Sequence, residues 1–132
     1  MTPRRSPIPT PSRAALLRAV PALVWAAIIF AGSSIPGSDL PGGFSMPGHL
    51  TEYAVLGALV MLAVSRPGAE RRAAFLALLV CSAYGVTDEF HQAFVPLRTP
   101  DPVDWATDTF GAALGVSAML LWLRARALRG RA

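Results

Sequence analysis

The sequence predicts an all-α integral membrane protein, a bundle of four transmembrane helices with both termini in the cytoplasm. Of its 132 residues, 53% are hydrophobic and 15% are charged, whereas a soluble domain carries about 25% charged residues. The apolar residues are concentrated in four segments, each long enough to cross a bilayer. The twelve basic residues are all arginine, and they lie mostly beside these segments, where such charges orient a membrane protein.

The first apolar segment covers residues 14–31, close to the minimum of about 17–20 residues for crossing a bilayer. Pro21 lies inside it, which a membrane helix tolerates. The preceding residues 1–13 are basic and proline-rich, and we expect a disordered tail. The basic start, short apolar run and small residues that follow would also fit a cleaved signal peptide. Cleavage would leave three spans in the same orientation.

The second span, residues 48–65, follows a loop at 32–48 that is rich in Gly, Pro and Ser. It ends at Arg66-Pro67-Gly68, a strong helix stop.

The third span is predicted at residues 73–94, and the prolines at 96, 100 and 102 keep the next loop non-helical. The fourth span, residues 103–123, precedes an arginine-rich tail at 124–132. We therefore expect one membrane domain, residues 14–123.

The arginines also predict the orientation, because cytoplasmic loops carry an excess of positive charge. Both termini should be cytoplasmic, and the loops at 32–48 and 95–102 should face outward. Arg98 is the only arginine on the outward side. The other eleven are Arg4, Arg5, Arg13, Arg18, Arg66, Arg71, Arg72, Arg124, Arg126, Arg129 and Arg131.

This arginine distribution also argues against nucleic-acid binding, although the net charge is +4. The basic residues flank the spans and do not interleave with aromatic residues that could stack on bases. The single Cys81 cannot form an internal disulfide and is expected to be a small buried apolar residue.

Most ionisable residues inside the apolar segments lie at the predicted outer surface. A charge at the bilayer centre costs about 2.5–3.5 kcal/mol on the insertion scale, so such a cluster indicates a functional site. In the second span, His49, Glu52 and Tyr53 share one helix face, and Gly57 continues it towards a close helix contact. These residues fit an interfacial anchor or a functional site equally well.

The third span carries Asp88, Glu89, His91 and Gln92 near its end. Carboxylates there oppose the helix dipole, which favours a functional site over an anchor. Successive side chains diverge by about 100°, so Asp88 and Glu89 are not expected to face one partner. His91 follows Glu89 at poor spacing for two metal ligands. We predict no metal or cofactor, and a metal would need ligands from different helices.

The fourth span carries Asp104, Asp108, Gly111 and Gly115 along one stripe. The two glycines form a small-xxx-small pattern suited to close helix packing, and Gly85 of the third span is expected to join this contact. Asp104 would also suit a helix N-cap or first-turn position.

Arg98 is expected to pair with Asp88, Glu89 or Asp104, because the acidic cluster offers a bidentate partner. The alternative role is a clamp for a phosphate or carboxylate ligand.

Four stretches of the chain, from about residue 25 to 122, resemble the VanZ-like family of small bacterial membrane proteins, named for a teicoplanin-resistance protein. They are Phe30-Ala-Gly-Ser33-Ser34-Ile-Pro36, His49-x-x-Glu52-Tyr53-x-x-Leu56-Gly57, Asp88-Glu89-x-x-Gln92-x-Phe94-x-Pro96-x-Arg98 and Asp104-x-x-x-Asp108-x-x-Gly111-x-x-x-Gly115.

The chain departs from the family in two places, both of which make the cluster more acidic. Ser45-Met46 stands where the family often has Asp-Lys, and Asp108 stands where asparagine is usual. The resemblance implies a membrane location and a link to the cell envelope or glycopeptide resistance, and it implies no reaction.

Three function classes remain open. The first is a non-catalytic envelope protein, in contact with the lipid bilayer, that binds a lipid-linked precursor, a glycopeptide antibiotic or a partner protein. The second is an intramembrane enzyme with His49 or His91 as base. The third is a small proton- or ion-coupled carrier.

Overall fold

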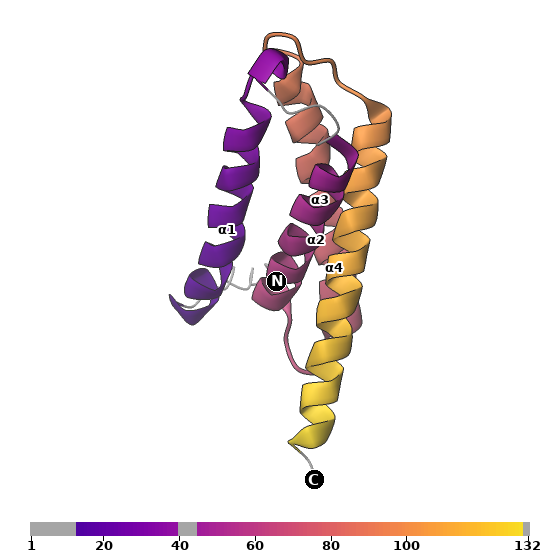
Figure 1. Cartoon of the computed structure of the whole chain (residues 1–132). Helices are drawn as coiled ribbons and strands as arrows, with labels where there is room; N and C mark the ends of the chain where they lie inside the picture. Colours follow the sequence, from indigo (N-terminus) through magenta and orange to yellow (C-terminus); the bar gives the residue numbers. More distant parts are fainter. Residues whose placement is uncertain (1–12, 40–44, 131–132) are drawn as a thin grey trace, which may run out of the picture.

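The computed structural model describes residues 13–39 and 45–130, so the predicted tail at 1–13 lies almost wholly outside the described residues. Four long helices run up and down in sequence order (Figure 1). α1 starts and α4 ends at the same end of the bundle. The elements are α1 (Arg13–Ser33), the 3-10 helix η1 (Gly37–Asp39), α2 (Ser45–Val64), α3 (Glu70–Gln92) and α4 (Pro102–Arg129).

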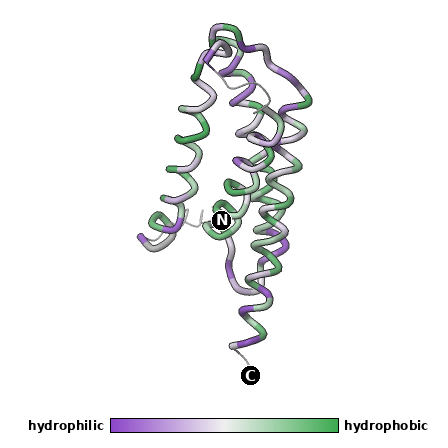
Figure 2. Tube along the Cα trace, in the orientation of Figure 1, coloured by the Kyte–Doolittle hydropathy of each residue, from purple (hydrophilic) through white to green (hydrophobic). Residues whose placement is uncertain are grey.

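All four long helices are long and apolar enough to span a membrane. Green, hydrophobic residues fill the middle of the helices, and purple, hydrophilic residues gather towards the ends of the bundle (Figure 2). Large apolar side chains point outward, with Leu23, Phe75 and Phe90 each about two-thirds exposed. Such a surface is stable against lipid and not against water. The chain is therefore a multi-pass membrane protein.

Several helix boundaries differ from the sequence prediction: α3 covers Glu70–Gln92 where 73–94 was predicted, and α4 continues to Arg129, into the segment predicted as a tail. Proline explains the differences at two helix starts. α2 begins at Ser45, inside the loop expected at 32–48, because Pro47 falls in the first turn, where no backbone N–H is needed. Pro102, expected to break helix, instead opens α4, and Asp101 accepts a hydrogen bond from the Val103 amide at 2.8 Å. The N-cap of α4 is thus Asp101, whereas Asp104 lies in the first turn.

α2 and α4 form the closest helix pair, because glycines allow their backbones to meet. A Cβ atom on Gly57 would collide with the Ala112 carbonyl, one on Gly111 with Leu50, and one on Gly115 with Ala54. In each case the obstacle is backbone, which cannot move aside without separating the helices.

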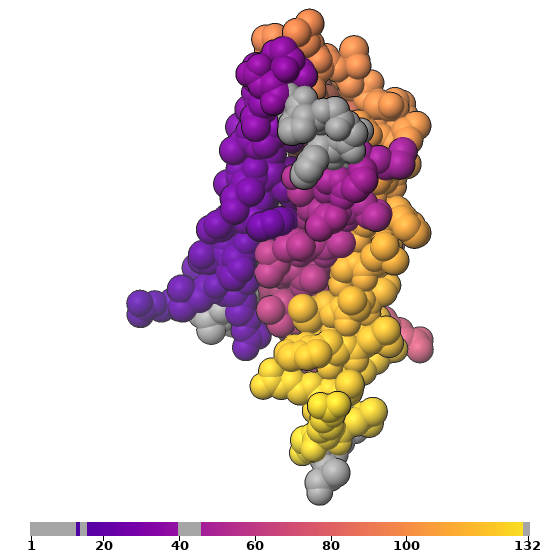
Figure 3. Space-filling view, in the orientation of Figure 1, coloured from indigo at the N-terminus to yellow at the C-terminus, as the bar shows by residue number. Residues whose placement is uncertain are grey.

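The core between the helices is apolar away from the end at which α1 stops and α2 starts. Met61, Ala77 and Cys81 are fully buried there. α1 lies along α2, and the end of α4 projects beyond the other helices (Figure 3). The buried polar side chains lie at the other end, where the α1–α2 and α3–α4 connections lie (Figure 1). They are Ser33, His49, Asp88, Glu89, Gln92 and Asp108.

Candidate functional site

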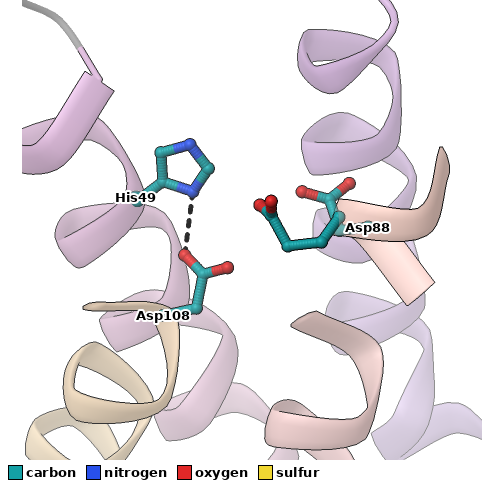
Figure 4. Close-up of side chains that lie close together, drawn as sticks. His49, Asp88 and Asp108 are labelled. Atoms are coloured by element: carbon teal, nitrogen blue, oxygen red, sulfur yellow. Dashed lines mark hydrogen bonds and ion pairs between the residues drawn. The ribbon is translucent and has the colours of Figure 1, made fainter. Parts of the chain in front are cut away.

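A buried hydrogen bond joins His49 on α2 to Asp108 on α4. The His49 Nδ1 lies 2.9 Å from the Asp108 Oδ1, and Figure 4 shows the two side chains directed at each other. Asp108 has no exposed surface, and His49 is 8% exposed. The local sequence makes this approach feasible, because Gly111 lies one turn after Asp108 and contacts Leu50, the residue after His49.

α3 contributes two buried carboxylates to the same region. Asp88 Oδ2 accepts hydrogen bonds from the Ser33 hydroxyl at 2.9 Å and from the Gln92 amide at 3.1 Å. Glu89 Oε2 accepts one from the backbone amide of Asp101 at 2.7 Å. α1 and the connection before α4 therefore hold the α3 carboxylates in place.

These groups converge across three helices, with Asp88 opposite the His49–Asp108 pair (Figure 4). One ligand atom from each of His49, Asp88, Glu89 and Asp108 lies within 4.8 Å of the others. We call these four residues the carboxylate–histidine cluster. Asp88 and Glu89 bond different partners, as the angle between them predicts, but one donor atom of each still lies within this cluster. A glutamate side chain has one methylene more than aspartate, so Glu89 reaches round the helix.

Each carboxylate of the cluster keeps one oxygen that is buried and lacks a hydrogen-bond partner within residues 13–39 and 45–130. These atoms are Asp88 Oδ1, Glu89 Oε1 and Asp108 Oδ2. The buried Tyr53 hydroxyl, one turn after His49, is in the same state among the described residues. A buried polar atom without a partner costs about 1–3 kcal/mol, so the arrangement is costly unless something binds it.

Two other predicted site residues, Asp104 and Glu52, lie on the helices around the cluster, and a third, His91, does not join it. Asp104 is half-buried, and its Oδ2 lies 3.9 Å from His49 Nε2. Glu52 is half-buried on α2, one turn from His49. His91 lies apart from the cluster: its ring stacks on Phe30 with centroids 4.3 Å apart.

Arg98 does not pair with a carboxylate, which corrects the sequence prediction. Among the described residues it makes no ion pair, and its Nε donates to the Ile35 carbonyl at 3.4 Å. The two connections meet beside it, where the Gly37 amide donates to the Pro96 carbonyl at 3.1 Å. Arg98 therefore joins this loop contact.

Sequence analysis missed the part that α1 plays in the site. Ser33 is buried and donates to Asp88, although the sequence showed it only as a small residue after the first span. The Trp25 indole donates to the Glu52 carbonyl at 2.9 Å, and the Tyr84 hydroxyl donates to the Ala26 carbonyl at 2.7 Å. The signal that could have revealed Ser33 is its place in the first stretch of the family resemblance.

The surface of α2 and α4 also carries an apolar groove of about 570 Å³, which no residue of the carboxylate–histidine cluster lines. His49 and Asp108 are each adjacent in sequence to a residue that lines it, Leu50 and Thr107. The lining residues are Met46, Pro47, Leu50, Val103, Ala106, Thr107 and Phe110.

Comparison with known proteins supports the family resemblance noted in the sequence. Neither the curated proteins nor the solved structures contain a significant match to this chain. The family model described as VanZ/LLP1 matches residues 19–124, which takes in nearly all of the four helices and the whole carboxylate–histidine cluster. The chain belongs to the VanZ/LLP1 family.

Proposed function

We propose that this protein binds a lipid-linked cell-envelope precursor at the outer face of the membrane, with the headgroup at the carboxylate–histidine cluster and the lipid chain in the adjacent groove. The arginine count supports an outward orientation of this end, because eleven of the twelve arginines precede or begin the first span, lie between the second and third, or follow the fourth.

The observation that carries the proposal is the set of buried oxygen atoms without a partner. Asp88, Glu89 and Asp108 are at most 8% exposed, yet each keeps a free oxygen. A cluster that only held the helices together would be expected to satisfy its own hydrogen bonds. Free acceptors held by a fixed framework are instead typical of a prepared binding site.

The groove supports a ligand with a lipid chain. Its lining is almost entirely apolar, and only Thr107 brings a polar side chain. It lies on α2 and α4, the two helices that also carry His49 and Asp108, so we place the lipid chain in the groove and the headgroup at the cluster.

An intramembrane enzyme is the second candidate, and the His49–Asp108 bond is the observation that favours it. A carboxylate that holds one ring nitrogen of a histidine orients the other nitrogen as a general base. A carrier is less favoured, because the core of the described helices below the cluster is apolar, with Met61, Ala77 and Cys81 fully buried.

The experiment is a binding titration of the purified full-length chain with a fluorescent polyprenyl pyrophosphate, compared with the matching polyprenol. We expect saturable binding of the pyrophosphate form. Ala106→Trp should fill the groove and weaken binding about tenfold or more, a loss of at least ~1.4 kcal/mol.

Ala118→Trp is the matched control, since Ala118 is an exposed residue of α4 outside the groove lining. It should leave the affinity unchanged. Equal binding of pyrophosphate and polyprenol, or an equal loss in both variants, would contradict the proposal.

A further inference from the structure

We propose that the carboxylate–histidine cluster is a binding site for one divalent transition-metal ion, of the Mn²⁺ or Zn²⁺ class. The inference deepens the proposed function and rests on it only for the role of the ion, because the donor geometry stands by itself.

The donor atoms already lie close enough to surround one ion. Metal–ligand bonds of about 2.0–2.2 Å place neighbouring donors roughly 3–4 Å apart. The four donor atoms lie within 4.8 Å of one another, so small side-chain rotations bring them to bonding distance. They come from α2, α3 and α4, which means that the fold of the bundle assembles the site and no single helix provides it.

The hydrogen-bond pattern of the three carboxylates is the same in each case. One oxygen is held by a donor: Asp88 Oδ2 by Ser33 and Gln92, Glu89 Oε2 by the Asp101 amide, and Asp108 Oδ1 by the His49 ring. The other oxygen is buried, without a partner among the described residues. Metal-binding carboxylates are held in this way, with one set of contacts fixing the orientation and the other atoms left for the ion.

A cation is the occupant that satisfies these atoms together. The three carboxylates repel one another, and their free oxygens have no donor among the described residues, because His49 bonds only the other oxygen of Asp108. Arg98 bonds the Ile35 carbonyl and makes no ion pair within the described residues. A divalent ion neutralises two negative charges and can bond several oxygens at once. One ammonium or guanidinium group neutralises only one charge.

The donor types indicate the class of ion. Carboxylate oxygens suit Mg²⁺, Ca²⁺ and Mn²⁺, whereas an imidazole nitrogen suits Zn²⁺ and other transition metals. A set with one His49 nitrogen and three carboxylates therefore favours an ion that accepts both, Mn²⁺ or Zn²⁺, over Ca²⁺, which prefers six to eight oxygens.

The ion would also explain how an acidic cluster binds a phosphorylated headgroup. Asp88, Glu89, Asp104 and Asp108 would repel a pyrophosphate. A bound divalent ion offsets two of these negative charges and presents a positive centre that phosphate oxygens can bind directly. The ion thereby becomes the contact between the chain and the anionic ligand.

The test uses the full-length chain, purified in detergent, stripped with a chelator and titrated with Mn²⁺ under electron paramagnetic resonance. We expect one Mn²⁺ per chain, displaced by Zn²⁺ and not by equimolar Ca²⁺, with a nitrogen hyperfine coupling that His49→Gln removes. Asp88→Asn and Asp108→Asn should weaken binding about 10–100-fold.

Glu70→Gln is the matched control, because Glu70 begins α3 at the opposite end of the bundle. It should bind Mn²⁺ like the parent chain. If an aspartate variant folds poorly, Glu89→Gln serves as a second ligand variant. The glutamine side-chain oxygen can still accept the hydrogen bond from the Asp101 backbone amide. The metal site would be overturned if neither Mn²⁺ nor Zn²⁺ bound saturably. An equal loss of Mn²⁺ affinity in Glu70→Gln and in the ligand variants would overturn it too.

The lipid titration separates this inference from the proposed function. If the chain binds the pyrophosphate lipid after chelation and binds no metal ion, the metal site is contradicted and the proposed function is not. One Mn²⁺ per chain without lipid binding would sink the proposed function and leave the metal site standing.

Discussion

His49 and Asp108 are joined by a 2.9 Å hydrogen bond beside one of the close glycine contacts between α2 and α4. Leu50, next to His49, lies against Gly111, one turn after Asp108. The polar bond and the glycine contact therefore fix the same register between the two helices, and a shift of either would break the other.

We predict that the His49–Asp108 pair stabilises the bundle through a measurable coupling. His49→Leu, Asp108→Leu and the double variant form a cycle in which each single change leaves a buried partner unpaired. The coupling free energy should be about 1–3 kcal/mol, measured by unfolding in mixed micelles. Additive effects of the two changes would mean that the bond contributes nothing to stability.

We predict that Gly115→Ala separates α2 from α4. The new Cβ would meet the Ala54 backbone, and overpacking of this kind costs about 1–3 kcal/mol. Gly32→Ala is the control, because nothing lies within 4 Å of a Cβ built there. A melting temperature lowered in both variants to the same extent would argue against a specific packing role for Gly115.

Glu89 has two separable roles, and two substitutions should divide them. Glu89→Gln removes the charge but keeps an oxygen for the Asp101 amide, so the unfolding free energy should change little. Glu89→Ala also removes the acceptor of that 2.7 Å bond and should cost about 1 kcal/mol or more. Equal stability of the two variants would show that the bond to the Asp101 amide does not support the start of α4.

Arg98→Gln should leave both folding and Mn²⁺ binding close to those of the parent chain. Arg98 reaches the Ile35 carbonyl at 3.4 Å, a weak contact away from the cluster, so the expected stability change is about 0.5 kcal/mol or less. Thermal melting and the Mn²⁺ titration provide the measurement. A large loss of metal affinity would place Arg98 in the site after all.

The topology is tested by cysteine labelling in intact cells, in a Cys81→Ala background. Ser38→Cys and Thr99→Cys, at exposed positions in the two connections beside the cluster, should react with an impermeant reagent. Ala69→Cys, between α2 and α3, should react only after permeabilisation. The opposite pattern would invert the orientation that the arginines predict.

The four helices were predictable because lipid imposes a simple rule on sequence. A span must be apolar and must satisfy its own backbone, so hydropathy, Arg66-Pro67-Gly68 and the prolines near residue 100 were enough to place α2, α3 and α4. Pro47 and Pro102 made the predicted starts of α2 and α4 too late, because proline fits the first turn of a helix as well as a loop.

The site was less predictable, because side-chain length and partner choice depend on tertiary contacts. The prediction for Asp88 and Glu89 used the correct angle between successive residues of a helix. It did not consider that the longer Glu89 side chain reaches the Asp101 amide. Arg98 was assigned a carboxylate on charge alone, whereas the junction of Gly37 with Pro96 places it beside Ile35. Ser33 has no charge, so a search for ionisable residues in apolar segments did not single it out as a site residue.

The length of α4 sets the depth at which the cluster sits. The helix rises about 1.5 Å per residue, so Asp108 lies roughly 24 Å along the axis from Arg124, the first of the arginines near its end. If Arg124 is held at one headgroup layer, a hydrocarbon core of about 30 Å leaves Asp108 only some 6 Å beneath the other. The arginines of the last turns of α4 thus fix the position of the helix along the membrane normal. They hold the carboxylates inside the hydrocarbon core, but close enough to the opposite headgroup layer for a dissolved ion to reach them.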